Sequence, residues 1–493
     1  MPTFQDVTLN ATGSVAGGDG IWRSNDLSGT TNSVENTTYT PTHYVTATAS
    51  GSDNGTSPST PWTMAQALTN ATAGNIIRIA PGTYSATATN DRFVPAHHPT
   101  NSGTSGNPIV FYAQYPAALN QGQTSLYTSM THDESGTGGS PTIGAGNGRS
   151  YITWDGMYID EATAEYESDS GPIVLFSCNN VIIKNCYVDG NTPTMPVPSD
   201  NHNSIRMEDA VDCEVANNYL FNARNVSDTH NGAGIMVYAF NRDSTGCNIH
   251  NNHIHSCGIG VYLKGEQGVN TIDNFDVHKN LITDCKFGIE CGAVTGVTGS
   301  RVYQNLVIGD GTTCEYAIQL GRSEVSLLTI ANNTIAKCEK GIEFFDAGTH
   351  AANTDTVNNI VYDPQTAGSP YFVNMGADGD SVTPAMAGLD DNCYYDPQST
   401  AQWHKGPTDY SSLATWQAAL GTCPVGDADC DSINSDPLFT DAANEDYTLT
   451  GSSPCLAANQ SATDILNLQG GGTGASIDMG CYVAGATVGL AAL

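Results

Sequence analysis

The sequence predicts an all-β solenoid, a parallel β-helix in which short strands stack coil upon coil. Three observations predict it: a repeat built on one asparagine, short alternating patterns inside each repeat, and few helix-forming stretches. The chain has 493 residues, too many for one compact core, whereas a solenoid grows one coil at a time and escapes that limit. Charged residues are only 13% of the chain. Gly, Asn, Ser and Thr supply the polarity instead, which suits turns better than helices.

The repeat is the strongest of these signals. Seven segments align on one asparagine at intervals of 25 to 34 residues: Asn185, Asn218, Asn252, Asn280, Asn305, Asn333 and Asn359. Parallel strands of successive coils lie about 4.8 Å apart, so an asparagine at the same corner of each coil is expected to bond to its neighbours above and below. We interpret the row as a structural ladder, not as catalytic machinery.

Alternating stretches follow the asparagine in each repeat. Residues 252–255 and 280–283 form the first kind, and residues 260–264, 288–291 and 341–344 form the second. Alternation over four or five residues indicates a half-buried strand. Two or three such strands per repeat, joined by turns of variable length, predict one coil of a β-helix.

The two ends of the chain carry a family resemblance. At the start of the chain, the segments are 43–57, 61–68 and Ile77-Arg-Ile-Ala-Pro-Gly-Thr-Tyr84. At the end of the chain, they are Tyr410-Ser-Ser-Leu-Ala-Thr-Trp416, Asp436-Pro-Leu-Phe, Asp446-Tyr-Thr-Leu and Ile477-Asp-Met-Gly480. They resemble the opening and closing segments of right-handed β-helix repeat proteins of the pectate-lyase-like superfamily. The resemblance spans residues 43–483 and implies right-handed coils, a short helix at about 61–72 that caps the first coil, and an irregular C-terminal closing segment. It implies little about activity, because members include lyases, hydrolases and proteins without known chemistry.

These observations divide the chain into four parts. Residues 1–42 are expected to be a leader or attachment arm, residues 43–75 the N-terminal cap, residues 76–363 the parallel β-helix, and residues 364–493 the closing segment.

One strip of the expected β-helix carries chemically mixed side chains. With the isoleucines of the second strands inward, the outward row reads Arg206, Met236, Tyr262, Glu290, Gln319 and Glu343, and the next row reads Glu208, Tyr238, Lys264, Gly292, Gly321 and Phe345. Aromatic rings stack on sugars, and charges fix carboxylates or hydroxyl groups. We therefore expect the strip to bind a polysaccharide or a host surface glycan, with these residues as its contacts: Arg206, Glu208, Tyr238, Tyr262 and Gln319.

Three mechanisms remain open for this strip. The segment 260–264 resembles the lysine-bearing strand of alginate lyases and chondroitinase B-like enzymes, which implies Lys264 as a base that removes the proton next to a uronate carboxylate. In a hydrolase, Glu290 and Glu343 would flank the glycosidic bond from about 9.6 Å apart, two strand spacings, near the upper end of the range for inverting enzymes. The third reading is binding without turnover.

An acidic loop offers a candidate calcium site. Asp427, Asp429 and Asp431 have the one-three-five spacing of a calcium loop, although the glycine at the sixth position is missing. Ca²⁺ is the one cofactor that the sequence raises.

Charge and cysteines bound the setting. Acidic residues number 50 against 16 basic ones, which gives a formal charge of -34. This charge disfavours nucleic acid as a partner. The sequence has no stretch of 18 apolar residues, so we expect no membrane insertion. Most of the 14 cysteines lie in apolar runs and are expected to be buried free thiols. Four in loop-like context are disulfide candidates: Cys423, Cys430, Cys455 and Cys481.

Two settings remain. The thiols, the leader of 42 residues and a start without a basic-then-apolar signal peptide favour a virion protein, such as a phage tailspike in the tail or a surface appendage. Such a protein is expected to form a homotrimer and to contact other virion proteins. The alternative is a secreted bacterial lyase or glycoside hydrolase that acts on acidic glycans.

Overall fold

The computed structural model describes most of the chain. The described residues are 36, 39–51, 53–87, 89, 91, 93–120, 123–133, 141–160, 171–190, 202–223, 232–265, 270–292, 294, 299–321, 325–345, 351–352, 354–365, 370–376, 388–420, 429–456 and 479–481. Their strands form three long parallel sheets, named A, B and C below, and the fold is a right-handed parallel β-helix, as the sequence predicts. Contacts divide the chain into an N-terminal unit that ends at Val261 and a C-terminal unit that begins at Tyr262.

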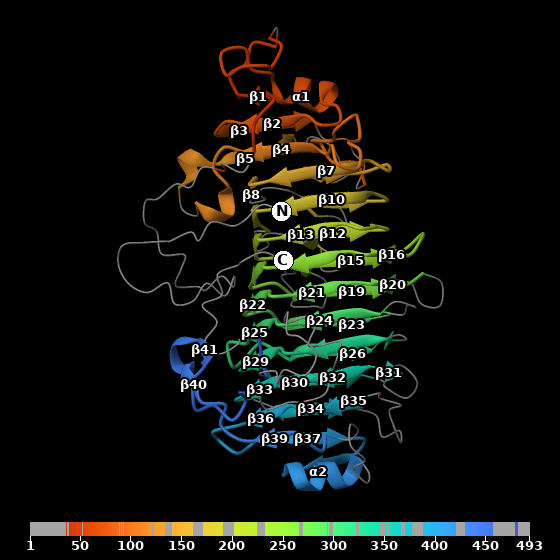
Figure 1. The fold of residues 1–493 in the computed structure, drawn as a ribbon, viewed down its shortest axis with the longest axis vertical. Helices are drawn as coiled ribbons and strands as arrows, with labels where there is room; N and C mark the ends of the chain where they lie inside the picture. The colour runs from red at the N-terminus through yellow and green to blue at the C-terminus, as the bar shows by residue number, and fades with distance from the viewer. Residues whose placement is uncertain are drawn as a thin grey trace. The chain divides into compact units, whose positions relative to one another are not determined.

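In the N-terminal unit a short helix, α1 (Met64–Asn70), follows the strand β1 (His43–Val45) and lies within the range expected for the cap. Thr63 caps the helix, because its hydroxyl accepts the backbone N–H of Gln66 while the Gln66 side chain accepts the backbone N–H of Thr63. Strands follow in turn on the three sheets (Figure 1). Sheet A holds β1 (His43–Val45), β2 (Ile76–Ile79), β4 (Ile109–Ala113), β7 (Ser150–Asp155), β10 (Asn179–Lys184), β13 (Glu214–Ala216) and β17 (Asn248–His250). Sheet B holds β3 (Gly82–Thr87), β5 (Thr128–Asp133), β8 (Tyr158–Asp160), β11 (Tyr187–Asp189), β14 (Tyr219–Phe221) and β18 (His253–His255). Sheet C holds β6 (Ile143–Ala145), β9 (Ile173–Phe176), β12 (His202–Glu208) and β15 (Gly232–Ala239).

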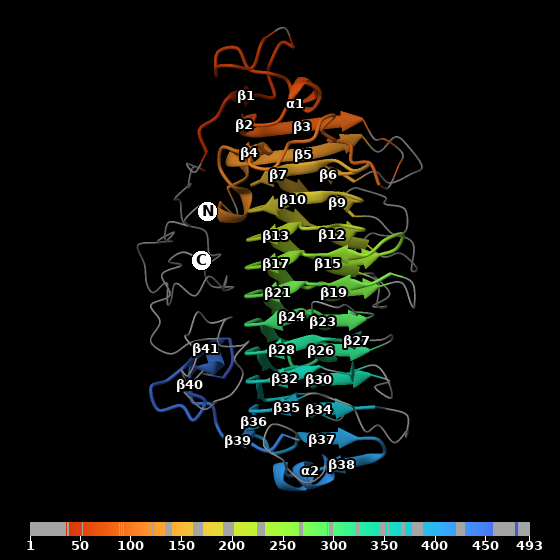
Figure 2. The same cartoon turned by 45° about the vertical axis from the view of Figure 1, so that its right-hand side comes forward.

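The C-terminal unit repeats the same three-sheet coil, and the view of Figure 2 separates its strands from one another. Sheet A holds β21 (Asp276–His278), β24 (Ser300–Tyr303), β28 (Leu328–Ala331), β32 (Asp355–Val357) and β35 (Gly388–Asp390). Sheet B holds β22 (Leu281–Thr283), β25 (Leu306–Ile308), β29 (Thr334–Ala336), β33 (Ile360–Tyr362), β36 (Cys393–Tyr395) and β39 (Ile433–Asn434). Sheet C holds β23 (Phe287–Gly292), β26 (Tyr316–Gly321), β30 (Lys340–Phe345), β34 (Tyr371–Met375), β37 (Gln402–Lys405) and β38 (Thr408–Tyr410). The unit border cuts β19 (Ile259–Gly265), a strand of the same sheet. Short strands decorate the turns: β16 (Ser244–Thr245), β20 (Ile272–Asp273), β27 (Val325–Ser326) and β31 (Ala351–Ala352).

The coils continue beyond residue 363, where the sequence placed their end. β35 pairs in parallel with β32, β36 with β33, and β37 with β34. The first antiparallel partner in sheet C is β38, after which α2 (Leu413–Leu420) follows. Sequence reasoning stopped too early because it missed Asn392, which continues the row 33 residues after Asn359, an interval within the range of the earlier repeats.

The closing segment returns along sheet B of the C-terminal unit. Its hairpin of β40 (Phe439–Asp441) and β41 (Asp446–Leu449) is antiparallel. Leu449, Cys455 and Met479 pack against Ile360 and Cys393 of the coils in one buried cluster. The hairpin and the residues that follow it therefore cover a side of the coils and do not extend the stack.

The asparagine ladder forms as predicted in most coils. In the C-terminal unit, Asn280, Asn305, Asn333 and Asn359 each donate the backbone N–H and Nδ2 to Oδ1 of the next asparagine, at 2.9–3.1 Å. Asn392 ends the row and donates its N–H to the hydroxyl of Ser432. All five asparagines are fully buried, so the ladder satisfies polar groups that have no access to water.

Asn185 does not belong to this ladder, contrary to the sequence alignment. The ladder position of its coil is Cys186, whose N–H donates to Oδ1 of Asn218 at 3.0 Å. Asn185 instead has a φ of 54° and shares a left-handed corner with Asn217 and Asn251. Asparagine tolerates this conformation better than most residues, which explains why Asn-Asn pairs recur and why the alignment slipped by one residue.

Cysteines line the interior of the coils. Twelve described cysteines are free and buried, among them Cys455 and Cys481, so the disulfide expectation for those two is wrong. Cys430 is disulfide-bonded, and Cys423 lies outside the described residues. No helix of the described chain is long and apolar enough to cross a membrane.

Candidate functional site

The outward row of sheet C in the C-terminal unit consists of polar side chains in successive coils. Strand register aligns Glu290 with Gln319, Gln319 with Glu343, Glu343 with Asn374 and Asn374 with His404. The first four are 0–4% exposed although they point away from the core isoleucines. The sequence predicted the first three members of this row, and the structure adds Asn374 and His404.

Glu343 is the centre of a hydrogen-bonded group. Its Oε1 accepts from Nζ of Lys340 at 2.7 Å and from Nδ2 of Asn374 at 2.8 Å, and its Oε2 accepts from Nε2 of Gln319 at 2.5 Å. Lys340 lies at the start of the same strand, and the other two donors come from the strands on either side. Both carboxylate oxygens are thus engaged, which holds three neighbouring side chains in fixed directions.

Glu290 occupies the same row two strands before Glu343, with Gln319 between them. Two strand spacings correspond to about 9.6 Å. Glu290 is fully buried, and burial together with its charge raises the pKa of the adjacent Cys291 thiol to about 12. The two carboxylates therefore sit in different surroundings, one within a cluster of donors and one beside a buried thiol.

Glycines occupy two positions of the neighbouring outward row on the same strands. A Cβ placed on Gly292 would lie 3.4 Å from the carbonyl oxygen of Gly321 and 3.7 Å from the ring of Tyr262. Gly321 is followed across the sheet by Phe345, which is 39% exposed. Lys264, the predicted lyase base, is half-buried on β19. Two buried glycines on successive strands thus lie between a tyrosine and an exposed phenylalanine.

The N-terminal unit carries the remaining predicted contacts. Arg206 and Glu208 form a buried ion pair on β12, in which Nε and Nη2 donate to Oε2 at 2.8 and 2.6 Å. The guanidinium also lies 5.4 Å from the ring centre of Tyr238, which pairs with Glu208 on the adjacent strand. The three residues form one cluster, whereas the alternation pattern had placed them in two neighbouring outward rows.

Further aromatic residues adjoin this cluster. The ring of Tyr238 lies 5.3 Å from that of Phe240, which is 42% exposed. Phe176, across the sheet from Glu208, stacks on Phe93 at 4.1 Å. Sequence reasoning missed these phenylalanines. The alternation of β9 and β15 would have found two of them, whereas no local pattern links Phe93 to Phe176.

Asp429 of the predicted calcium loop points into the interior of the described chain. Asp429 is fully buried, and its oxygens accept from the hydroxyls of Tyr394 and Ser432 and from Nε1 of Trp416 at 2.8 Å. Burial raises its pKa to about 7. Asp429 therefore fastens α2 to β36, and Asp427 lies outside the described residues.

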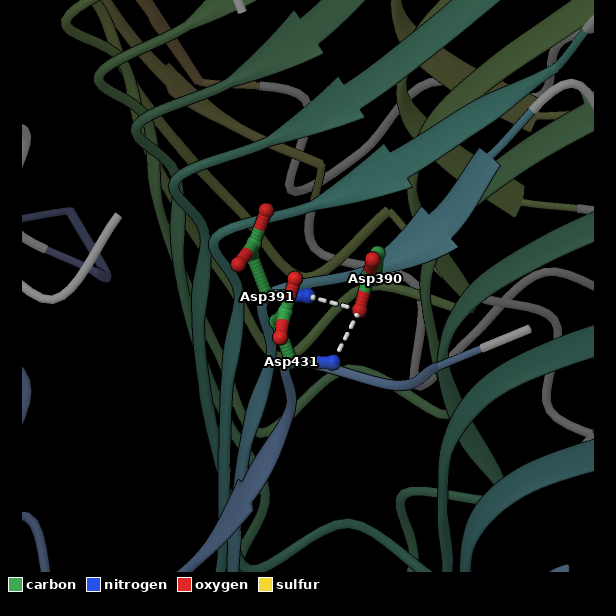
Figure 3. A group of neighbouring side chains, drawn as sticks. All are labelled: Asp390, Asp391 and Asp431. Carbon is green, nitrogen blue, oxygen red and sulfur yellow. Dashed lines mark hydrogen bonds between the residues drawn. The ribbon is translucent and has the colours of Figure 1, made fainter. Parts of the chain in front are cut away.

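Asp431 joins two other carboxylates instead. One oxygen each of Asp390, Asp391 and Asp431 lie within 4.8 Å of one another. Figure 3 shows that Oδ1 of Asp390 also accepts the backbone N–H groups of Asp391 and Asp431, at 2.9 and 2.7 Å. These backbone bonds explain how three acidic residues are held together, and oxygen ligands of this kind are those that Ca²⁺ prefers.

Comparison with known proteins identifies the fold. No family model matches the chain, and no curated protein matches it in sequence. Among solved structures, the pectate lyase Pel9A has a TM-score of 0.51 at 14% identity, with 90% of this chain and 96% of that chain covered. A lacto-N-biosidase from Eubacterium ramulus has a TM-score of 0.43 at 10% identity, over 74% of this chain and 65% of that one. An alginate lyase from Paenibacillus sp. has a TM-score of 0.33 at 15% identity, over 69% and 91%. The first match confirms the parallel β-helix fold, and an identity this low carries the fold alone.

Proposed function

We propose that this β-helix binds polysaccharide on the outer face of sheet C in the C-terminal unit. The observation that carries the proposal is the row of aligned polar side chains in successive coils, Glu290, Gln319, Glu343 and Asn374, beside the side-chain-free positions Gly292 and Gly321. A chain of repeating sugars presents equivalent groups at intervals, and a solenoid presents equivalent positions at intervals. Polar groups that fix orientation beside aromatic rings are typical of carbohydrate sites.

Affinity electrophoresis through gels that contain soluble polysaccharides tests the proposal. Phe345→Ala and Tyr262→Ala should lose much of the retardation of the parent chain, because each removes a ring next to the glycine surface. Leu438→Ala is the matched control, since Leu438 has almost the same exposure, 38% against 39%, in the closing segment. Equal retardation of all variants, or no retardation of the parent by any polysaccharide, would refute the proposal.

Catalysis by this face is a second candidate function. The spacing of Glu290 and Glu343 favours an inverting hydrolase, and the lyase reading would require Lys264 to act as the base. Reducing ends that disappear in Glu290→Gln would support hydrolysis, whereas unsaturated uronates that disappear in Lys264→Ala would support the lyase. Absence of both products from a polysaccharide that retards the chain would leave binding alone.

For the biological setting, we propose a virion adhesin that recognises a host surface glycan as a homotrimer. The twelve buried free thiols of the described chain support folding in a reducing compartment, although Cys430 is disulfide-bonded, and side-by-side solenoids bury more surface than one alone. Sedimentation equilibrium should give three times the chain mass of 51.6 kDa. A mass of one chain at micromolar concentration would refute the trimer, and absence of the protein from purified particles would favour the secreted enzyme.

A further inference from the structure

Glu343 fixes the direction of two amide side chains. Gln319 and Asn374 both donate through the amide nitrogen to this carboxylate, one from each neighbouring strand. A carboxylate in an ion pair, here with Lys340, accepts hydrogen bonds and donates none. The nitrogen of each amide is therefore held towards Glu343, and each carbonyl oxygen is directed to other surroundings.

Both carbonyl oxygens are buried acceptors. Oε1 of Gln319 and Oδ1 of Asn374 accept no hydrogen bond from any group in the described part of the chain. The two side chains belong to residues that are 2% and 4% exposed. A buried acceptor without a partner is unfavourable, so these two positions favour a ligand that brings hydrogen-bond donors. A sugar hydroxyl donates, whereas the ionised carboxylate that replaces the primary hydroxyl in a uronate cannot.

Within each unit, the lysine and arginine side chains of the described sheet C strands already have interaction partners. Their partners are Glu208 for Arg206, Glu343 for Lys340, and the carbonyl of Ala419 for Lys405, while Lys264 also has an interaction partner. A uronate polymer would have to compete with these groups, against a formal charge of -34. Recognition of acidic sugars instead requires cations that are open to bidentate pairing.

We propose that sheet C of the C-terminal unit selects a neutral polysaccharide, whose hydroxyl groups donate to Gln319 and Asn374, over a polyuronate. The inference rests on the proposed function and names its substrate class. It differs from the acidic glycans expected for the alternative of a secreted lyase or glycoside hydrolase.

The test compares gels that contain neutral polymers, such as xylan, mannan and β-glucan, with gels that contain polygalacturonate or alginate, with and without calcium. The parent chain should be retarded by at least one neutral polymer and by neither polyuronate. Gln319→Leu should weaken the retardation about two- to ten-fold, the equivalent of one hydrogen bond of about 0.5–1.5 kcal/mol. Gln365→Leu is the matched control, because the Gln365 amide also donates to a carboxylate, Asp363, but lies outside sheet C.

A charge variant gives the opposite readout. Glu343→Gln leaves Lys340 without its carboxylate partner, so the variant should gain a salt-sensitive retardation by polygalacturonate that the parent lacks. Thermal unfolding of each variant separates loss of binding from loss of fold.

The outcomes distinguish the two claims. Stronger retardation of the parent by a polyuronate than by every neutral polymer would overturn the neutral class and leave polysaccharide binding standing. Retardation by no polymer of either class would overturn the proposed function and the inference together. Equal changes in retardation for Gln319→Leu and Gln365→Leu would show that the amide acceptors of sheet C do not contribute to binding, and would overturn the inference.

Discussion

Replacing Asn333 by alanine removes one rung from the middle of the ladder. The lost side chain accepts the backbone N–H and Nδ2 of Asn305, at 2.9 and 3.0 Å, and donates to Oδ1 of Asn359 and to the carbonyl of Val302, both at 3.0 Å. At about 0.5–1.5 kcal/mol for each bond, the loss amounts to about 2–6 kcal/mol. The upper half of this range is expected, because the buried N–H of Asn305 is left without an acceptor.

Urea unfolding followed by circular dichroism measures this loss as a lower midpoint. Asn444→Ala is the control, since its exposed amide makes one bond, to Asp441, and such surface changes stay within about 0.5 kcal/mol. The Asn305→Ala and Asn333→Ala double variant should cost less than the sum of the single variants, because the two side chains share bonds. A midpoint for Asn333→Ala equal to that of the control would show that the ladder adds nothing to stability.

Three further outcomes are expected. The raised pKa of Asp429, about 7, means that the folded chain binds this proton more tightly than the unfolded chain. Its contribution to stability is therefore present below about pH 4 and is lost as the pH rises through 7. Asp429→Asn should flatten that part of the curve of unfolding midpoint against pH, and an unchanged curve would refute the assignment. Burial raises the pKa of Cys186 and Cys291 to about 12. A disulfide reagent should therefore label these thiols only after urea unfolding, which peptide mass spectrometry can measure. Fast labelling of the native chain would contradict their burial. Gly321→Ala should destabilise the chain, because φ is 126° and the added Cβ would collide with the carbonyl oxygen of Phe345, whereas Gly292→Ala has room. Equal melting temperatures of the two glycine variants would refute that reasoning.

The repeat made the coils predictable, because each one places the same residue types at the same corners. It did not fix the register at Asn185. In other coils an Asn-Asn pair fills the left-handed corner and the ladder position, whereas in this coil Asn185 fills the corner and Cys186 the ladder position. Polar side chains of one strand could be assigned to the outer face from alternation alone. Their partners could not, because Gln319 and Asn374 reach Glu343 from the strands on either side.

The acidic loop illustrates the same limit at longer range. The spacing of Asp429 and Asp431 predicted shared ligands, but the tertiary structure turns the first into the coil against Trp416 and sets the second beside Asp390. Spacing in the sequence describes neighbours along the chain. Contacts made across 13 or 41 residues depend on packing that spacing does not encode.

The ladder also limits how such a chain changes in length. Asn333 contacts the asparagines 28 residues before and 26 residues after it, and the bonds on its two sides are alike. Deleting one whole coil would let Asn305 meet Asn359 through the same bonds, whereas deleting half a coil would break the row. Duplication and loss of genetic segments are therefore tolerated in steps of one coil, so related chains should differ in length by multiples of a turn.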